Sequence, residues 1–538
     1  MTNKLLSYIL CILFAWTLTS CEHKDNSNNV FVYNESNGIS TLDPAYARDI
    51  EIMWATNQLF DGLVELDDSL HIVPAICKSY SISEDQLLYT FSIRTDVNFH
   101  NSPCFSNGEG RVCNAYDFKF SFERIINPAT ASPGKWIFDQ VSEDGIQALN
   151  DTTLQIKLKK PFAPFLGLLT TQYANVVPQE AIAFYGKDFA RHPIGTGPFQ
   201  FAFWYEDIAL IFHKNPQYFQ FDEMGHRLPY LDAIKIEFVK DMTAEYLGLM
   251  QGKYDFMSGV TTAFKDELLD ANGNLLPAPR SQIQLQKTPF IKTDYLGIVC
   301  DPLLQKNAAL FNPNVRQALH LAIDKKKMVK YLRNNTVIAA ENGFCSPAVG
   351  NGINTSPRYS FELEKAKQLL ITAGYPNASG IPKIELATTA DYADLMEFIQ
   401  HEWQKIGIEC EVTILQKGTF SESTSKCQIS IFRKSWLADH THPENFYALF
   451  STNYFTPNGP NYTHFSNVKY DSLYSEIART NQPLELANIA NQMEEIIAME
   501  TPVIPLYYDQ VMHFVSNRIS QFPTNSVNML DLRRVKKN

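Results

Sequence analysis

One short stretch of this 538-residue chain gathers side chains that could bind a metal ion. Asp439 is followed by His440 and His442, and a His-x-His pair beside a carboxylate can coordinate a transition metal. The alternative, which we favour, is that both histidines lie on a loop in contact with water. Because no Cys-x-x-Cys pair or zinc-finger spacing occurs elsewhere, neither a structural metal nor another cofactor is expected.

Motifs of catalysis are missing or incomplete. His401 and Glu402 are adjacent, but the second histidine that zinc needs one helical turn later is missing. The chain has no Gly-x-Ser-x-Gly elbow, and residues 248–253 fit a phosphate loop poorly. The sequence therefore predicts a protein that is not an enzyme, although two acids of the glycosidase kind could still be hidden among its many carboxylates.

Composition and charge exclude two broad classes of function. The chain is 45% hydrophobic, and 46 basic residues against 58 acidic ones give a net charge of −12. This charge opposes contact with a phosphate backbone, so nucleic acid is not expected as a partner. No apolar run reaches the roughly 18 residues that a spanning helix needs, which excludes a polytopic channel or transporter.

Strand and helix patterns alternate along the chain. Alternation of apolar and polar residues predicts strands at 89–94, 154–158 and 234–238. Apolar residues at helical spacing predict four helices, which contain residues 315–323, 363–370, 395–403 and 486–497. The predicted fold class is therefore α/β or α+β, and no repeat indicates a solenoid or propeller.

The first residues have the pattern of a secretory signal. Lys4 precedes an apolar stretch at 5–18, and small residues lead to Cys21. Leu-Thr-Ser-Cys at 18–21 resembles a bacterial lipobox, which implies cleavage after residue 20 and acylation of the Cys21 thiol; the alternative is an ordinary signal peptide with an unrelated cysteine. Residues 21–29 are polar and are predicted to form a flexible tether. The lipid would then hold the protein on a membrane of the cell envelope or periplasm without spanning it.

Seven cysteines remain after Cys11 and Cys21. Cys104 and Cys113 flank a turn and could form a disulfide in an oxidising compartment. The other five are scattered, and we interpret most of them as small buried hydrophobic residues.

Several segments, taken in order, resemble the family 5 extracellular solute-binding proteins, the oligopeptide- and dipeptide-binding lipoproteins of ABC importers. They include Thr-Leu-Asp-Pro at 41–44 and Trp-Leu-Ala-Asp at 436–439. The remaining segments are 58–64, 73–80, 89–94, 114–124, 193–199, 315–325, 443–446 and 501–508. Each segment is short, but their shared order over about residues 30–538 identifies the chain as similar to this family.

The resemblance implies a two-lobed clamshell of the periplasmic-binding-protein type, type II with an extra domain. The implied boundaries are 30–57, 184–289 and 504–538 for domain I, 58–183 for the inserted domain II, and 290–503 for domain III, the opposing lobe. The chain would cross between lobes near Pro289 and near residues 502–505. Two short crossings permit closure about a hinge.

The resemblance also implies which residues bind ligand. The family places a carboxylate for a peptide's ammonium where Asp439 stands, and the alternative role for Asp439 is a helix cap. Arg433 stands where a basic residue can meet a ligand carboxylate, or else it forms a surface salt bridge. Trp436 could wall a side-chain pocket or pack in the core.

The peptide backbone is expected to add as a strand to two exposed edges, one from Ser435 to Leu437 and one at residues 38–40. Weaker candidates for the lining, with core burial as the favoured alternative, are Tyr507, Tyr508 and Trp136. Two departures from the family pattern are His442, where a second acid is common, and residues 99–101, which replace a Trp-x-x-Gly motif.

The resulting hypothesis is a monomeric, lipid-anchored protein that captures short peptides and delivers them to the subunits of an ABC permease. One alternative keeps the fold and changes the ligand to nickel, haem, an opine or an oligosaccharide. Others are an exported hydrolase and a surface or signalling lipoprotein without a permease.

Overall fold

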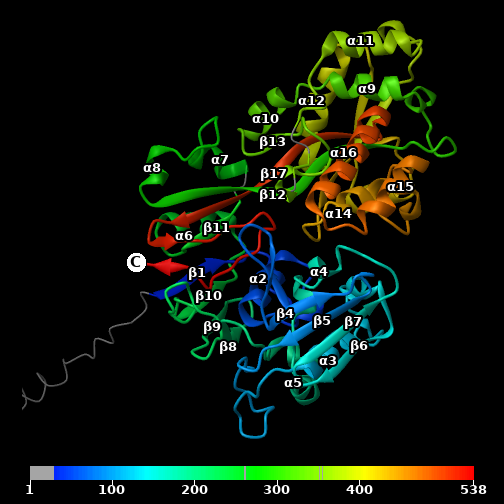
Figure 1. Ribbon diagram of the computed structural model, residues 1–538. Helices are drawn as coiled ribbons and strands as arrows, with labels where there is room; N and C mark the ends of the chain where they lie inside the picture. The colour runs from blue at the N-terminus through cyan, green and yellow to red at the C-terminus, as the bar shows by residue number, and fades with distance from the viewer. Residues whose placement is uncertain (1–28, 260–261, 351, 354–355) are drawn as a thin grey trace, which may run out of the picture.

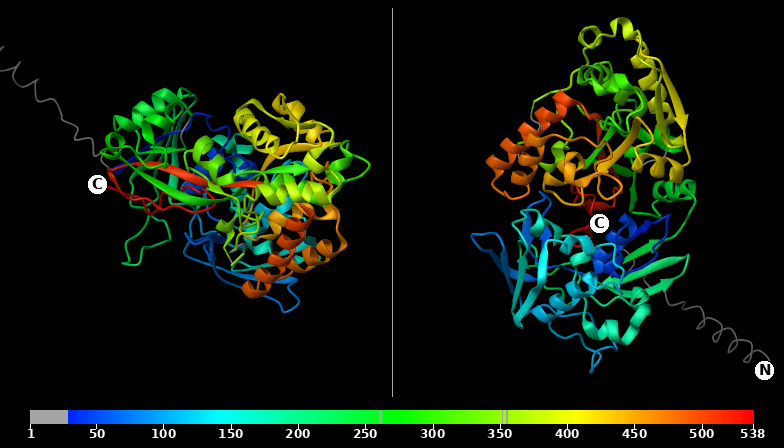
Figure 2. Two further views of the ribbon diagram at one scale, coloured as in Figure 1. Left: turned by 90° about the horizontal axis from the view of Figure 1, so that it is seen from above. Right: turned by 90° about the vertical axis from the view of Figure 1, so that its right-hand side faces the viewer.

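The computed structural model describes residues 29–259, 262–350, 352–353 and 356–538 and shows two lobes joined by a pair of long strands (Figure 1). These strands are β12 (Ile283–Ile298) and β17 (Val503–Ser516). In the right-hand view of Figure 2 the blue and cyan lobe lies below the green, yellow and orange one. The predicted signal peptide at 1–20 and nearly all of the tether at 21–29 lie outside the described residues.

One sheet runs through both lobes. Its strands follow the order β15-β14-β16-β12-β17-β11-β1-β10-β9-β8, and β13 pairs with β17 beside this path. Its other strands are β1 (Val30–Asn34), β8 (Phe199–Tyr205), β9 (Ala209–Lys214), β10 (Ala233–Glu237), β11 (Phe256–Ser258), β13 (Ile338–Ala339), β14 (Ile384–Thr388), β15 (Cys410–Ile414) and β16 (Ile431–Leu437). β1 is parallel to β10, whereas β12 is antiparallel to both of its neighbours.

A second sheet, of order β4-β5-β7-β6, lies in the lower lobe with α3 (Ala115–Ile126) against it. Asn114 and Asp117 form a capping box that fixes the start of α3, and Phe118 and Phe122 are fully buried. The strands of this region are β2 (Val64–Leu66), β3 (Ile72–Pro74), β4 (Cys77–Ile82), β5 (Leu88–Ile93), β6 (Val141–Asn150) and β7 (Thr153–Leu158).

The remaining elements are mostly helices that cover the large sheet (Figure 1). In the lower lobe and beside the crossing they are α2 (Ile50–Leu59), α4 (Phe165–Leu168), α5 (Gln179–Tyr185), α6 (Met242–Met250), α7 (Thr262–Leu268) and α8 (Pro277–Arg280). In the upper lobe they are α9 (Pro313–Leu321), α10 (Lys325–Arg333), α11 (Leu363–Thr372), α12 (Ala393–Gln404), α13 (Lys417–Ser425), α14 (Glu444–Tyr447), α15 (Val468–Ile477) and α16 (Pro483–Glu500).

Short 3-10 turns and one small ladder complete the described chain. The turns are η2 (Pro44–Tyr46), η3 (Lys135–Phe138), η4 (Gln172–Ala174), η5 (Gly186–Arg191), η6 (Ala308–Phe311), η7 (Pro347–Val349), η8 (Pro376–Ala378), η9 (Ala390–Tyr392), η10 (Ala448–Phe450) and η11 (Thr452–Tyr454). The ladder pairs β18 (Ile519–Gln521) with β19 (Lys536–Lys537). Across the ranges the structure describes, no helix combines the length and apolar character needed to cross a bilayer.

The mixed α/β class predicted from the sequence is confirmed. The three predicted strands correspond to β5, β7 and β10, and the four predicted helices correspond to α9, α11, α12 and α16. One core fills the lower lobe, and two others cover opposite faces of the sheet in the upper lobe. Because each lobe has its own core, each can move as a unit.

The ladder between β12 and β17 is interrupted where it passes from one lobe to the other. Residues 283–289 pair with 510–516, and residues 293–297 pair with 503–508, with a shift of register between them. The interruption begins directly after Pro289, which still pairs with Gln510 and lies where a crossing was predicted; in β17 it falls at Asp509. A second shift of register, between Asp294 and Tyr295, falls at Leu506 in β17, beside the other predicted crossing at 502–505. The domain boundaries themselves remain predictions.

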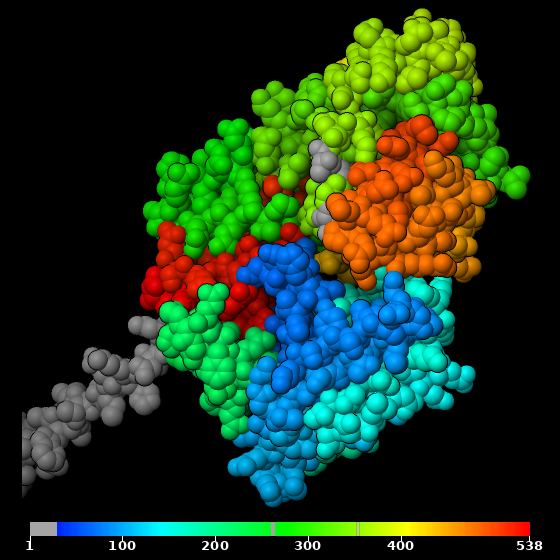
Figure 3. All heavy atoms as spheres, viewed as in Figure 1, coloured from blue at the N-terminus to red at the C-terminus, as the bar shows by residue number. Residues whose placement is uncertain are grey.

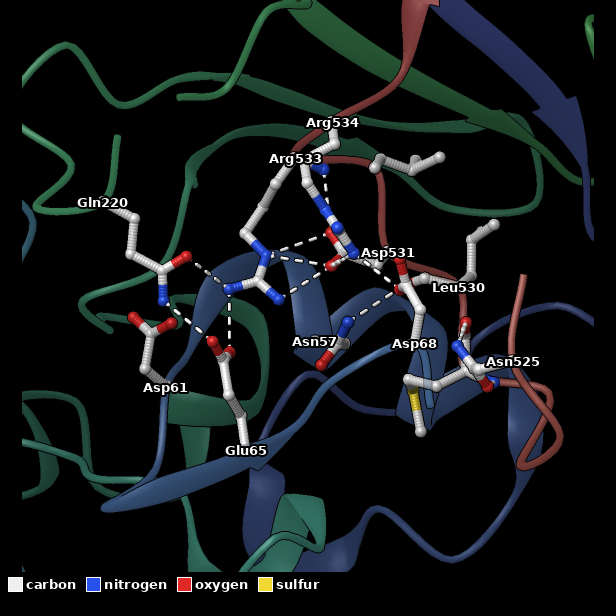
Figure 4. Close-up of polar contacts among 12 residues, drawn as sticks. Asn57, Asp61, Glu65, Asp68, Gln220, Asn525, Leu530, Asp531, Arg533 and Arg534 are labelled. Carbon is white, nitrogen blue, oxygen red and sulfur yellow. Dashed lines mark hydrogen bonds and ion pairs between the residues drawn. The ribbon is translucent and has the colours of Figure 1, made fainter. Parts of the chain in front are cut away.

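The C-terminal segment ties the parts of the lower lobe together (Figure 4). Arg533 donates to Glu65 at 2.8 Å, to Gln220 at 2.7 Å and to Asp531 at 2.7 Å. The guanidinium is almost enclosed, so these charge-assisted bonds join residues far apart in the sequence inside a poorly solvated site.

The two cysteines that were predicted as a possible disulfide are free thiols in the structure. Cys113 is fully buried, and its N–H donates to the carbonyl of Val97, whereas Cys104 lies in the preceding loop. Burial raises the pKa of the Cys113 thiol well above its usual value, which keeps it protonated and unreactive.

Candidate functional site

Most of strand β16 has one free edge. β12 pairs with all of residues 431–437, but on the other side β14 pairs with β16 only at Ile431 and Phe432. Among the strands that the structure describes, none continues this pairing along residues 433–437. Backbone groups there are therefore available to a ligand that lies along the edge.

The two faces of this free segment have different surroundings. Arg433 is 9% exposed, and its Nε donates to Oδ1 of Asp294 at 2.9 Å. Its guanidinium also lies 3.3 Å from the centroid of the Tyr392 ring. The basic residue predicted to meet a ligand carboxylate is thus already neutralised by a carboxylate of β12. Ser435, half-buried, follows on the same face of β16, since side chains alternate along a strand.

Trp436 lies on the opposite face. Its indole Nε1 donates to Oδ1 of Asn445 at 2.9 Å, and the ring packs against the core of the upper lobe. The side chain is half-buried, so it packs on the core and leaves part of its ring open; its role as the wall of a side-chain pocket stays a prediction.

Asp439 follows the free edge directly. Its Oδ2 is 3.5 Å from Nδ2 of Asn445, and its N–H donates to Oδ1 of the same residue. No cation among the described residues forms an ion pair with this carboxylate. The residue is exposed to solvent. Desolvation of its carboxyl by the surrounding protein nevertheless raises the pKa of Asp439, and the hydrogen bond from Asn445 partly offsets this rise.

Asp439 lies close enough to the lower lobe to act on the charge of Tyr173. Burial first, and then the charge of Asp439, raises the pKa of Tyr173 in η4 to about 12. The lobes touch nearby, where the N–H of Ala163 donates to the carbonyl of Ala478 at 2.9 Å. In Figure 3 the orange part of the upper lobe lies directly on the blue and cyan lower lobe. Asp439 therefore lies at the junction of the lobes.

Of the two histidines beside Asp439, His440 is buried and His442 is half-buried, so the water-exposed loop favoured from the sequence is not what the structure shows. His442 accepts from the N–H of Glu444 through Nδ1, and its Nε2 bonds to the carbonyl of Thr480 at 3.1 Å. Burial lowers the pKa of His440 to about 3 and that of His442 to about 4, so both rings are neutral at pH 7. No group of three residues suited to a metal ion occurs in the part of the chain that the structure describes.

A cavity of about 750 Å³ lies between the lobes at the crossing strands. Ser258 and Met512 line it from one side, and Arg333, Tyr392 and Tyr507 line it from the upper lobe. Tyr507, a predicted lining residue, therefore reaches this cavity.

Two basic residues at this cavity are each paired with an acidic residue that also lines it. Nζ of Lys292 lies 2.7 Å from Oδ2 of Asp509, and Nη1 of Arg333 lies 3.0 Å from Oδ2 of Asp394. The cavity wall is thus polar but carries few charges without a partner, which suits a ligand bound mainly through its backbone.

The other predicted residues lie further away. The Tyr508 hydroxyl donates to the carbonyl of Gly343 at 2.7 Å and lines a separate cavity of about 640 Å³. Trp136 is 37% exposed on η3 in the lower lobe. Residues 38–40 form a loop after β1 rather than a strand, so the exposed strand edge predicted there is not present.

Sequence reasoning missed three partners of the predicted residues. Asp294 pairs with Arg433, Tyr392 stacks on it, and Asn445 joins Trp436 to Asp439. Of these three residues, only Asn445 could have been found from the sequence, because it lies in the segment 443–446 that resembles the family.

Comparison with known proteins shows the family to which the chain belongs. The sequence model of the bacterial extracellular solute-binding proteins, family 5, matches residues 71–458. The chain is 26% identical over 502 residues to the glutathione-binding protein GsiB of Escherichia coli O6:K15:H31, with 92% of each chain covered. Two solved structures are similar at 25% identity each. HbpA2 of Haemophilus parasuis has a TM-score of 0.83 and covers 95% of this chain and 100% of its own.

The second is the periplasmic binding protein DppA of Helicobacter pylori in complex with the peptide STSA. Its TM-score is 0.71, and the match covers 94% of this chain and 98% of that one. DppA is described as associated with an ABC transporter, and GsiB as a glutathione-binding protein. The chain therefore belongs to family 5 of the bacterial extracellular solute-binding proteins, which serve ABC transporters.

Proposed function

We propose that this protein captures short peptides between its lobes and delivers them to an ABC permease. The observation that carries the proposal is the Asp439 carboxylate, which lies at the end of the free edge of β16 and has no cation partner among the described residues. A free ammonium is common to all unmodified peptides, so a carboxylate in this position recognises the class rather than one sequence.

The free edge supplies the second part of the proposed recognition. A peptide added along residues 433–437 forms main-chain hydrogen bonds that do not depend on its side chains. Water in the roughly 750 Å³ cavity can then bridge to side chains of different size.

Closure follows from the interrupted ladder between β12 and β17. The interruption lets the lobes rotate as units, and a ligand that contacts both lobes favours the closed arrangement. The permease would then distinguish the closed, loaded protein from the open one.

Calorimetry tests the proposal directly. The purified mature protein is titrated with tri- and tetrapeptides that have free amino ends, and in parallel with nickel chloride. Saturable binding of peptides supports the proposal. Binding of nickel without binding of any peptide contradicts it and favours the alternative ligand class.

We further propose that the mature protein is held at the membrane of the cell envelope through acylated Cys21. Full-length protein expressed in a bacterial host should incorporate a labelled fatty acid and sediment with membranes. Cys21→Ala should abolish both. Equal labelling of the two proteins would contradict the anchor and leave the ligand proposal untouched.

A further inference from the structure

Lys434 is a cation on the free edge of β16, and its charge is not paired in the part of the chain that the structure describes. Its Nζ lies 3.7 Å from the centroid of the Tyr462 ring, and no carboxylate among the described residues forms an ion pair with it. The side chain is half-buried, so its ammonium is partly desolvated and still accessible.

The other cations close to this edge are already paired. Arg433 is bound to Asp294, and Lys292 is bound to Asp509. Lys434 therefore differs from its neighbours: it is the one of these three whose charge is balanced only by an aromatic face.

The surroundings of the Lys434 ammonium are electrostatically unfavourable when no anion is bound. Burial lowers the pKa of Lys434, and the positive charge of Arg433 lowers it further, to about 8. A half-buried ammonium beside another cation is costly, and an incoming carboxylate would offset both the desolvation and the repulsion.

The position of Lys434 matches the path of the proposed ligand. Lys434 and Trp436 lie on the same face of β16, because side chains two apart in a strand point the same way, and Trp436 and Tyr462 both pack against one core. A ligand whose ammonium is at Asp439 runs back along the edge toward Lys434. At about 3.3 Å per residue, the five residue steps from Lys434 to Asp439 span about 17 Å, whereas an extended tri- or tetrapeptide backbone spans about 10–13 Å, so the side chains of Lys434 and of the ligand must cover the rest.

We propose that Lys434 receives a carboxylate of the bound ligand, so that the protein selects short peptides with an anionic group several residues from the ammonium. This inference rests on the proposed peptide-binding function. The carboxylate comes either from an acidic side chain or from the free C-terminus of the peptide.

Calorimetry with matched peptides tests the inference. Ala-Glu-Ala is compared with Ala-Gln-Ala, Ala-Ala-Glu with Ala-Ala-Gln, and each peptide with its C-terminal amide. For the wild-type protein, at least one exchange of a carboxylate for an amide should weaken binding about tenfold or more, the value of a charge-assisted hydrogen bond. The exchange that causes the loss identifies the source of the carboxylate.

Three variants assign the effect to Lys434. Lys434→Met should remove the preference, whereas Lys434→Arg should retain most of it. Lys330→Met is the matched control, because Lys330 is an exposed lysine that also stacks on a tyrosine, Tyr331, at 5.4 Å, and it should leave the preference unchanged.

The outcomes separate this inference from the function on which it rests. Peptide binding with no preference in the wild type, or with a preference that survives Lys434→Met, overturns the role of Lys434 alone. Absence of binding for every peptide overturns the proposed function. Circular dichroism of each variant confirms that a lost preference is not caused by unfolding.

Discussion

Asp439 has a polar neighbour but, within the described ranges of the chain, no counter-ion, and this incomplete pairing suits a binding site. Asn445 offers the carboxylate one long hydrogen bond of 3.5 Å and also orients the loop through its bonds to Trp436 and to the Asp439 N–H. The amide thus holds the carboxylate in place without neutralising it, and a charged ligand can complete the site.

Asp439→Asn should weaken binding of peptides with free amino ends by hundreds- to thousands-fold, because loss of one partner of a buried ion pair costs about 3–5 kcal/mol. N-acetylated peptides lack the ammonium and should lose far less. Titration of both peptide forms into both proteins measures the difference. An equal loss for the two forms would show that Asp439 does not bind the ammonium.

The charge of Lys434 predicts a pH dependence of selectivity. The pKa of Lys434 is lowered to about 8, so the ammonium is mostly charged at pH 7 and mostly neutral at pH 9.5. A carboxylate stabilises the charged form, and the preference for an anionic peptide should be present below about pH 8 and fall above it.

The groups around Lys434 do not titrate in this window. Arg433 stays charged, and burial raises the pKa values of Tyr462 and of the cross-strand Tyr295 above their usual value of 10.0. The ratio of dissociation constants for Glu and Gln peptides, measured at pH 7 and 9.5, cancels titration of the shared amino end. A ratio that does not change with pH would argue against Lys434.

The sequence located the candidate site but not its contacts. The motif at 436–439 placed Asp439 through its resemblance to a family, and the structure puts this residue at the junction of the lobes. The pairing of Arg433 with Asp294 could not be anticipated, since the two are separated by 139 residues and meet only through the register of β12 and β16. The burial of His440 likewise depends on the other lobe packing nearby.

At the scale of elements, the free edge of β16 exists because β14 is short. β14 ends at Thr388 and pairs with only the first two residues of β16. The chain then turns into η9 and α12, which leaves residues 433–437 paired on one side. The edge is therefore a product of topology rather than of any motif within β16.

Strand addition predicts a pattern of sensitivity to backbone methylation of the ligand. In a ladder, alternate N–H groups of the peptide point toward the protein edge. Methylating those nitrogens should weaken binding by about 5- to 150-fold, because a buried partner left unsatisfied costs about 1–3 kcal/mol. Methylating the intervening nitrogens should weaken binding only slightly. Uniform effects along the peptide, measured by calorimetry, would contradict binding as an added strand.

Local patterns predicted most elements but not the interruption between β12 and β17. The predicted strands and helices agree with β5, β7, β10, α9, α11, α12 and α16 because period 2 and period 3.6 are visible within one segment. The interruption depends instead on how residues 290–292 face β17, more than 200 residues later. No pattern within a single segment of the sequence predicts which residues of β12 and β17 pair.

At the scale of the molecule, the lower lobe must be rigid for closure to be transmitted. Arg533 supports this by joining the C-terminal segment to Glu65 and Gln220 (Figure 4). Its charge is balanced mainly by Asp531 and Glu65. After the chain has returned from the upper lobe through β17, the C-terminal segment thus completes the packing of the lower lobe.

Arg533→Met should lower the free energy of unfolding of the protein by about 3–5 kcal/mol, because it leaves buried carboxylates without their partner. Arg534→Met is the matched control. Arg534 is more exposed and pairs with Asp68 at 2.6 Å, so its loss should cost about 1 kcal/mol or less. Urea denaturation of the two variants measures both values, and a loss of about 1 kcal/mol or less for Arg533→Met would show that the Arg533 network does not stabilise the lobe.

A crystal structure of the mature protein with a bound tripeptide tests the central claim most directly. We predict that the peptide lies along residues 433–437 between closed lobes, with its amino nitrogen within about 3 Å of an Asp439 carboxylate oxygen, as a charge-assisted hydrogen bond requires. A peptide bound elsewhere, with the Asp439 carboxylate in contact only with water and Asn445, would contradict the account.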